Sequence, residues 1–457
     1  MARPVQDSTR AHAVVIGASI GGLAAAAALA QSYQRVTVIE RDTLPAGPDN
    51  RRGVPQGKHA HGLQPGGLLA LEKLLPGITD ELIALGVPSG DLSLIGNWLV
   101  GGGRLARGPA GVPGVGVTRP FLEHRVRTRV AALPGVTILD GVEALRPITD
   151  GPNRISGLEV GPTGGGPTER ISADLVLDAT GKVSKLPRWL ADLGHPVPAE
   201  EQVHCKMAYL SRRYQLADPD AMKGDLVTII TPAATPHFGV MIAQEDGSHI
   251  VTLGGLLDSG PARDDEAYLA FAASLPDPAI ADALVGATPL TELQPSHFPA
   301  SCRRRYDKLR SFPAGLLALG DSIASFNPMY GQGMTVAALQ AVALRDHLGK
   351  GPLDARKFFA RAHRIEDVAW KIATGGDLRF DAVEGKRTAS GKLMNRYLDR
   401  LTLAARTDPV LSRQFLLVAG FVEGPESFFK PSIVRRVFAG GHGRQQQQQP
   451  TEQVAIG

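Results

Sequence analysis

Residues 12–40, HAVVIGASIGGLAAAAALAQSYQRVTVIE, decide the fold of this 457-residue chain. The runs 12–16 and 35–39 are short, apolar and rich in β-branched residues, which predicts two buried strands. The Ala-rich run 20–31 between them predicts a helix. Short buried strands on either side of a helix indicate a β-α-β unit of a parallel sheet.

The turn before the helix reads Gly17-Ala18-Ser19-Ile20-Gly21-Gly22, and Glu40 ends the second strand. Gly17 permits a tight turn, Gly22 permits close packing of helix on strand, and the free N–H groups of the helix attract a pyrophosphate. Glu40 can accept hydrogen bonds from ribose hydroxyls. Ser19 stands at the usual middle glycine, so its side chain must tilt away from the phosphates or hydrogen-bond to one. The motif predicts a dinucleotide site and does not choose between NAD and FAD.

The uncharged run 13–30 also has features of a signal peptide, because it follows Arg3 and Arg10 and ends in Ala-Leu-Ala. The glycine turn within it, followed by a strand at the correct distance, favours the dinucleotide fold instead. No other stretch is long and apolar enough to span a bilayer. We expect a cytoplasmic protein without an integral membrane segment.

Composition limits the remaining classes of protein. The length favours two or three domains, and 43% apolar residues allow a sizeable core. The 49 basic and 45 acidic residues nearly balance at +4, and no dense basic block predicts a nucleic-acid partner. Two distant cysteines, Cys205 and Cys302, exclude a disulfide framework and fit a reducing compartment. We interpret both as small buried or half-buried residues.

Further along the chain, residues 43–66 predict a long structured loop, and 119–133 predict an amphipathic helix. A hairpin with a Gly-rich tip is expected near 161–167. Residues 203–256 contain four successive strand patterns with a turn at Glu245-Asp246-Gly247, which indicates a separate antiparallel sheet. A buried strand at 316–319 leads through a glycine-rich turn into a helix at 334–348. Residues 354–436 read as largely helical, and the Gln-rich tail is expected to be disordered.

Two later segments resemble a known family. Residues 317–321, LALGD, and 326–334, FNPMYGQGM, resemble the second FAD fingerprint of the flavoprotein monooxygenases related to para-hydroxybenzoate hydroxylase. Residues 174–181, DLVLDATG, resemble the middle motif of that family, which is associated with FAD and NAD(P)H. The resemblance implies that Asp321 binds the ribityl chain of FAD, that the amides of the 328–333 loop face the isoalloxazine ring, and that Arg119 contacts FAD.

Residues 41–67, RDTLPAGPDNRRGVPQGKHAHGLQPGG, narrow the resemblance. They look like the corresponding segment of the bacterial polyether and polyene epoxidases, and the Tyr209 and Arg212 spacing matches that group too. The strings LQPGG at 63–67 and GMTVA at 333–337 also resemble squalene epoxidases. The resemblance covers residues 12 to 350, and its subgroup also includes hydroxylases.

The implied fold is α/β: a Rossmann-like FAD-binding domain, an inserted antiparallel sheet that binds substrate, and a C-terminal helical region. We expect the FAD-binding domain at 1–90, 115–200 and 296–350, and the substrate domain at 91–114 and 201–295. The helical region is expected at 351–436 and the tail at 437–457. The predicted cofactor-binding residues are Gly17, Ser19, Ile20, Gly21, Gly22, Glu40, Arg41, Arg52, His61, Arg119, Asp321, Pro328, Gly331, Gly333 and Met334. The candidate substrate-pocket residues are Trp98, Tyr209, Phe238, Met241, Phe326 and Tyr330, for each of which core packing is an alternative.

The sequence gives weaker support for a metal site or for phosphate binding by other charged residues. His59 and His61 lack a third ligand at a suitable spacing, so we predict packing or hydrogen bonding rather than a metal site. Arg51, Arg52 and Lys58 could meet phosphates of FAD or of NAD(P)H, or be solvated loop charges. Residues 303–305, three arginines, are interpreted as a solvated strand edge.

The resemblance implies a monooxygenase of secondary metabolism in which NAD(P)H reduces FAD, O2 adds to give a flavin hydroperoxide, and an alkene of an apolar polyketide or terpenoid is epoxidised. Flavin-centred chemistry needs no protein nucleophile, and no Ser/His/Asp constellation occurs, so we name no catalytic residue. An aromatic hydroxylase, or a non-oxygenating flavin reductase or cyclase, are the alternatives. A halogenase is disfavoured because no WxWxIP string occurs. An NAD-dependent dehydrogenase would lack bound yellow flavin.

Overall fold

A computed structural model describes residues 10–439. The predicted β-α-β unit is confirmed by β1 (His12–Ile16), α1 (Ile20–Leu29) and β2 (Arg35–Ile39). β1 lies at the centre of a parallel sheet with the order β20-β11-β1-β2-β7. The other strands of this sheet are β7 (Val136–Leu139), β11 (Leu175–Asp178) and β20 (Leu316–Ala318).

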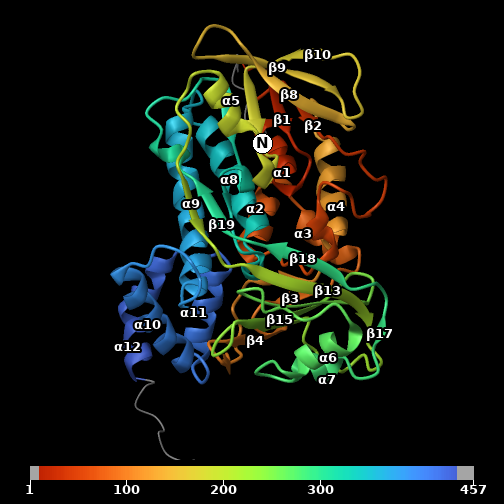
Figure 1. Ribbon diagram of the computed structural model, residues 1–457, viewed down its shortest axis with the longest axis vertical. Helices are drawn as coiled ribbons and strands as arrows, with labels where there is room; N and C mark the ends of the chain where they lie inside the picture. Colours follow the sequence, from red (N-terminus) through yellow and green to blue (C-terminus); the bar gives the residue numbers. More distant parts are fainter. Residues whose placement is uncertain (1–9, 440–457) are drawn as a thin grey trace, which may run out of the picture.

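Small residues allow α1 to approach α8 (Gly333–Leu348) closely. A Cβ at Gly21 would lie 3.3 Å from Cβ of Ala337, and the five alanines 24–28 of α1 are buried. Figure 1 shows α8 beside α2 and the long α9 in one helical layer. The other helices that surround the parallel sheet and α8 are α2 (Pro65–Leu74), α3 (Ile78–Ala84), α4 (Arg119–Ala131), α5 (Leu186–Asp192) and α9 (Ala355–Asp377).

The predicted hairpin forms a small antiparallel sheet above the parallel one (Figure 1). Its strands are β8 (Val142–Thr149), β9 (Ile155–Pro162) and β10 (Glu169–Ser172). The Gly-rich tip lies between β9 and β10, where Gly165 and Gly166 have positive φ.

A larger sheet has the order β17-β13-β16-β15-β14-β4-β5, with β18 also paired to β13. Its pairs are antiparallel except β14 with β4. One face packs on α6 (Asp265–Ala273) and α7 (Ala279–Ala283) around Tyr268 and Leu253. The other face borders the cavity described below. The strands are β4 (Gly96–Val100), β5 (Gly103–Arg104), β13 (Met207–Gln215), β14 (Val227–Ile230), β15 (His237–Ala243), β16 (His249–Gly255), β17 (Thr288–Pro289) and β18 (Gln294–Phe298).

The C-terminal helices pack on the segment that leads into and out of β4 and β5. Leu92 and Leu105 share a core with Leu416 and Phe428, whereas Phe429 is half exposed. A short ladder of β3 (Ser89–Asp91) and β6 (Pro113–Val115) flanks this core. The helices are α10 (Ala389–Ala404), α11 (Pro409–Ala419) and α12 (Pro431–Ala439). Residues 437–439 of the predicted tail belong to α12. The rest of that tail, 440–457, and the predicted start of the chain, 1–9, lie outside the described residues.

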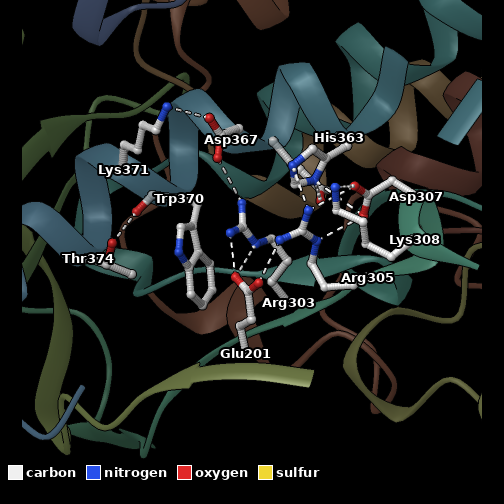
Figure 2. Close-up of polar contacts among 11 residues, drawn as sticks. Glu201, Arg303, Arg305, Asp307, Lys308, His363, Asp367, Trp370, Lys371 and Thr374 are labelled. Carbon is white, nitrogen blue, oxygen red and sulfur yellow. Dashed lines mark hydrogen bonds and ion pairs between the residues drawn. The ribbon is translucent and has the colours of Figure 1, made fainter. Parts of the chain in front are cut away.

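The interpretation of 303–305 as a solvated edge was wrong. Arg303 on β19 (Ser301–Arg304) is buried, pairs with Glu201 and Asp367, and stacks over Trp370 of α9. Figure 2 shows this cluster, in which Arg305 pairs with Glu201 and Asp307. The strand is covered because α9 folds back over it, which no local pattern reveals. β19 pairs with β12 (Glu200–Val203) and β21 (Ala324–Ser325).

Both cysteines are free, Cys205 buried and Cys302 half-buried, as predicted. Burial raises the pKa of the Cys205 thiol to about 12, so it stays protonated at neutral pH. Across residues 10–439 no helix combines the length and apolar character needed to cross a bilayer.

Candidate functional site

In the glycine turn, residues 17–22, the backbone packs closely against the end of β2 and against the start of α1. Gly17 has φ +102°, and its N–H donates to the carbonyl of Ile39 at 2.7 Å. A Cβ at Gly22 would lie 1.8 Å from the carbonyl oxygen of Gly17, which no side chain can occupy. Ser19 is the N-cap of α1 but its side chain does not cap the helix. The first N–H groups of α1 are therefore available to an anion.

Ser19 is hydrogen-bonded away from the helix N-terminus. Its Oγ accepts from Nη2 of Arg119 at 2.7 Å, and the same guanidinium pairs with Glu123 at 3.0 Å. Nε of Arg119 is buried and has no partner among the described residues. Glu123, which the sequence analysis did not single out, also pairs with Arg51 at 2.8 Å. Its signal in the sequence is the i,i+4 spacing from Arg119 on one helix face.

Glu40 stands under the turn. Its carboxylate accepts from the amides of Ala18 at 2.9 Å and Asp42 at 3.0 Å, and it pairs with Arg51 at 3.1 Å. Each carboxylate oxygen has further lone-pair capacity, so ribose hydroxyls can still donate to it. Arg51 thus joins Glu40, Asp42 and Glu123 in one buried network.

Arg41 and Arg52, both predicted to bind cofactor, have exposed side chains. Among the described residues, Arg41 is held through its backbone carbonyl, which accepts from Thr163. The inward position of this loop is taken by the neighbouring Arg51, which has three carboxylates to pair with. A contact of Arg41 or Arg52 with phosphate stays a prediction.

The middle and last motifs are tied together. Buried Asp178 accepts from the hydroxyl of Ser184 at 2.5 Å and from that of Ser322 at 3.2 Å. Ser322 in turn accepts from the amide of Gly181 at 2.9 Å. The turn Gly320–Ser322 is thereby fixed beside the turn Gly181–Val183. Ser322 was not predicted, because its partner is 144 residues away in the sequence.

Asp321 lies where these turns meet the start of α8. A Cβ at Gly333 would be 3.3 Å from its Oδ1, and one at Gly181 would be 3.7 Å from its Cβ. Burial raises the pKa of Asp321 to about 6, against the opposing charges of Arg119 and Lys182. Asp321 is half-buried, and its carboxylate oxygens are not among the fully buried atoms without a partner. No group of residues 10–439 donates to this carboxylate, so it is open to a donor that the chain itself does not supply.

The loop before α8, residues 326–332, is held by hydrogen bonds to the end of α9 and to Gln64. Asn327 is buried, and its side-chain amide donates to Asp377 at 2.9 Å. Tyr330 donates from its hydroxyl to the same carboxylate at 3.2 Å, and Gln64 donates to the carbonyl of Tyr330 at 3.2 Å. Gly331 has φ +63°, which favours glycine there. Gln332 caps α8 without a side-chain bond, so its first amides are free.

A cavity lies between this loop, residues 59–64 and the larger sheet. It contains about 940 Å³ of space between protein atoms, part of it open to solvent. Four of the six predicted pocket residues line it: Trp98, Tyr209, Phe238 and Tyr330. Pro328, Gly331 and His61 of the predicted cofactor set line it as well.

Met241 and Phe326 do not line this cavity, contrary to the prediction. Side chains alternate along β15, so Phe238, Val240 and Ile242 face the cavity while Met241 packs against the α6 side of the sheet. Phe326 packs with Trp370 of α9. Because neighbouring side chains of a strand point to opposite faces, Phe238 and Met241, three residues apart on β15, cannot line the same cavity.

The two histidines are held by hydrogen bonds. Nδ1 of His59 lies 2.8 Å from Oγ of Ser211, and Nδ1 of His61 lies 3.0 Å from the carbonyl of His59. Burial lowers the pKa of each to about 4, so both are neutral at pH 7. Within the described part of the chain, no group of three His, Cys, Asp or Glu residues is arranged to hold a metal.

These features fit FAD. The uncapped α1 and the unpaired Nε of Arg119 suit a pyrophosphate, Glu40 suits a ribose, and unpaired Asp321 suits a polyhydroxyl chain. Residues 328–331, which lead into α8, line the cavity, where a flat ring would meet a substrate. The sequence contains no second glycine fingerprint that would hold NAD(P)H as a tightly bound dinucleotide.

The fold is that of flavin-dependent monooxygenases and halogenases. Similar solved structures include the flavin-dependent brominase Bmp2, with TM-score 0.66 at 14% identity over 94% of this chain and 98% of that one. Another is the p-nitrophenol 4-monooxygenase PnpA of Pseudomonas putida, with TM-score 0.62 at 15% identity over 89% and 97%. A flavoprotein/dehydrogenase from Cytophaga hutchinsonii has TM-score 0.66 at 17% identity over 93% and 96%.

Sequence comparison places the chain more narrowly. Residues 15–65 match the NAD(P)-binding Rossmann-like domain family. The chain is 36% identical over 429 residues to Protein Rv3254 of Mycobacterium tuberculosis. The matched region covers 89% of this chain and 88% of that protein. It belongs to the same family as Protein Rv3254.

Proposed function

We propose that the protein is an FAD-dependent monooxygenase that uses NAD(P)H and O2 to epoxidise an alkene of an apolar polyketide or terpenoid. The observation that carries the proposal is the apolar cavity between the larger sheet and the Pro328–Tyr330 turn, which lies in the segment between Asp321 and α8. The resemblance of residues 41–67 to the polyether epoxidases favours epoxidation. The similar structures, which include a brominase and a nitrophenol monooxygenase, support the class of enzyme.

FAD, once reduced by NAD(P)H, supplies the activated oxygen. The chain's own residues bind and orient. The first amides of α1 and the guanidinium of Arg119 would hold the pyrophosphate, Glu40 would accept from the ribose, and Asp321 would accept from the ribityl hydroxyls. The amides at the start of α8 would offer the positive end of a helix to negative charge on the ring.

The side chains that line the cavity have two further roles, exclusion of water and binding of an apolar substrate. Its apolar side chains, such as Trp98, Phe238 and Ile242, exclude water and hold an apolar chain by burial. None of its described lining residues is Ser, Cys, Lys, Asp or Glu, which suits a reaction in which an electron-rich carbon attacks activated oxygen. We assign no general base.

The test uses the purified full-length protein. Yellow absorbance that copurifies with it establishes flavin. Anaerobic reduction by NADH or by NADPH, followed by O2 and a polyene or terpenoid, should give a product heavier by one oxygen atom with epoxide reactivity. Substrate reduction without oxygen uptake would reject any oxygenase function.

The same experiment separates the alternatives. A phenolic product from an aromatic substrate would identify a hydroxylase of the same fold. Incorporation of bromide or chloride in place of oxygen would identify a halogenase, although the sequence lacks the WxWxIP string.

A further inference from the structure

His59 is held at the wall of the cavity by a chain of hydrogen bonds. The amide of Ala60 donates to Oγ1 of Thr252 at 3.0 Å, and that oxygen lies 2.7 Å from Oγ of Ser211. Oγ of Ser211 lies 2.8 Å from Nδ1 of His59. The imidazole also meets the ring of Tyr209 edge-on, with centroids 4.9 Å apart. The ring is therefore fixed on two sides.

Counting protons gives this chain two directions, because each hydroxyl carries one. If Thr252 donates to Ser211 and Ser211 donates to His59, every hydroxyl proton has an acceptor. In the reverse direction the proton of Thr252 has no acceptor among residues 10–439, and it would face the cavity, which Thr252 also lines. Both directions leave one donor for the cavity, and in the first direction Nδ1 of His59 accepts and Nε2 carries the proton.

Nε2 of His59 is directed to the cavity. It makes no hydrogen bond to the described residues, and it is not one of the fully buried atoms that lack a partner. Since His59 is otherwise buried and lines the cavity, the open space that this nitrogen meets is the cavity itself. A single N–H donor therefore faces a largely apolar volume.

The wall of the cavity carries no formal charge. None of its described lining residues is Lys, Arg, Asp or Glu, and burial lowers the pKa of both His59 and His61 to about 4. A carboxylate or phosphate taken into this space would lose its water without gaining a cation, which is strongly unfavourable. A neutral carbonyl or ether oxygen would lose little and gain one donor.

We propose that the cavity selects an uncharged, largely apolar molecule with one acceptor oxygen, such as a ketone, ester or ether oxygen, and that Nε2–H of His59 donates to that oxygen. The inference rests on the proposed function, in which this cavity receives the substrate. It narrows the substrate class to neutral molecules and excludes aromatic acids. His59 then determines specificity and orientation, and it takes no part in oxygen transfer.

The test measures binding without turnover. Isothermal titration calorimetry on the FAD-saturated protein at neutral pH compares farnesylacetone with farnesylacetic acid, which share a chain and differ in the charge of the oxygen group. We expect the ketone to bind at least about tenfold more tightly than the carboxylate. His59→Phe keeps the ring beside Tyr209 and removes the donor, so it should weaken ketone binding about fivefold to tenfold. His237→Phe makes the same change on β15 outside the cavity and should leave binding unchanged.

A second variant tests the proton chain itself. Ser211→Ala removes the donor to Nδ1, which frees His59 to carry its proton there and turn Nε2 into an acceptor. Ketone affinity should then fall about fivefold, and affinity for the matching alcohol should rise relative to the ketone. Melting temperature and bound flavin report whether each variant is folded.

Equal affinity for ketone and carboxylate, unchanged ketone affinity in His59→Phe, or no binding of the ketone to the wild type would each overturn the inference. Failure of the proposed function looks different. Ligands would bind with the predicted preference, and no oxygen would be consumed.

Discussion

The side-chain amide of Asn327 donates a hydrogen bond of 2.9 Å to the carboxylate of Asp377, and both residues are fully buried. This bond joins the loop before α8 to the last turn of α9. The hydroxyl of Tyr330 reaches the same carboxylate, so the loop is held at two points. The C-terminal region thus fixes the backbone that the proposed FAD ring would face.

Asp377 should make stability depend on pH. Burial raises the pKa of its carboxyl from 3.8 to about 7. Between these values the folded protein keeps a proton that the unfolded chain has lost, so the free energy of unfolding falls as the pH rises from about 4 to about 7. Asp377→Asn has no such proton. As the pH rises through this window, the wild type loses stability and the variant does not. The free energy of unfolding of Asp377→Asn should therefore rise relative to that of the wild type, by up to about 1.4 kcal/mol per pKa unit.

Denaturant titrations at several pH values measure this difference. Asp192→Asn, on the exposed face of α5, is the matched control and should run parallel to the wild type. Parallel curves for Asp377→Asn would show that Asp377 is ionised in the folded protein.

Asp321 should govern flavin affinity. Removal of the unpaired carboxylate beside Gly333 takes away an acceptor for the ribityl chain, and an ionic hydrogen bond contributes about 1.5–3 kcal/mol. Asp321→Ala should therefore raise the dissociation constant for FAD at least tenfold, as measured by flavin fluorescence on adding FAD to the apoprotein. Asp192→Ala should bind like the wild type, and equal affinities of the two variants would place the cofactor elsewhere.

Gly22 should be intolerant of any side chain. A Cβ there would lie 1.8 Å from the carbonyl oxygen of Gly17, so Gly22→Ala must push α1 off β1. We expect a loss of several kcal/mol of stability or no soluble protein, because backbone cannot yield as a side chain can. Gly164, in the turn after β9, has nothing within 4 Å of its added Cβ. Gly164→Ala should melt within a degree or two of the wild type, and similar melting temperatures for both variants would contradict the tight turn.

Arg303 should stabilise the docking of α9. It is buried between Glu201 and Asp367 and stacks on Trp370, with its guanidinium carbon 4.7 Å from the ring centroid. Arg303→Ala should lower the free energy of unfolding by about 1–3 kcal/mol, since it removes the packing of a buried side chain and one of the two cations that each of Glu201 and Asp367 pairs with. Arg188→Ala on exposed α5 should change it by less than about 0.5 kcal/mol. Arg303→Lys tests the planar fork and should recover only part of the loss, because a lysine neither stacks nor pairs in two directions.

Much of the fold could be predicted from local pattern. β1, α1 and β2 were expected within two residues of their ends, because buried β-branched runs and an Ala-rich run have few other solutions. The four strands expected in 203–256, which are β13 to β16, and the helix after Asp321 also agreed with their patterns. Candidate site residues with a local reason, such as Gly17, Gly22 and Tyr209, lie at the turn or in the cavity.

Residues whose role depends on distant partners could not be predicted in this way. Which of two adjacent arginines turns inward was decided by Glu123 on α4, which pairs with Arg51. Met241 and Phe238 look alike in the sequence, and the pleat of β15 sends them to opposite faces. Arg303 looked like a surface charge until α9 covered it.

By itself, the sequence determined the β-α-β unit with its glycine turn, because steric limits on backbone and the burial of apolar runs act within a few residues. The tertiary structure alone decided that Asp321 stands unpaired beside Gly333, that Asp377 supports the loop, and that His59 faces an uncharged cavity. The position of Asp377 and of His59 arises from hydrogen bonds across 50 and 152 residues of chain. The lack of a partner for Asp321 depends on everything that packs around it, and such relations have no trace in local pattern.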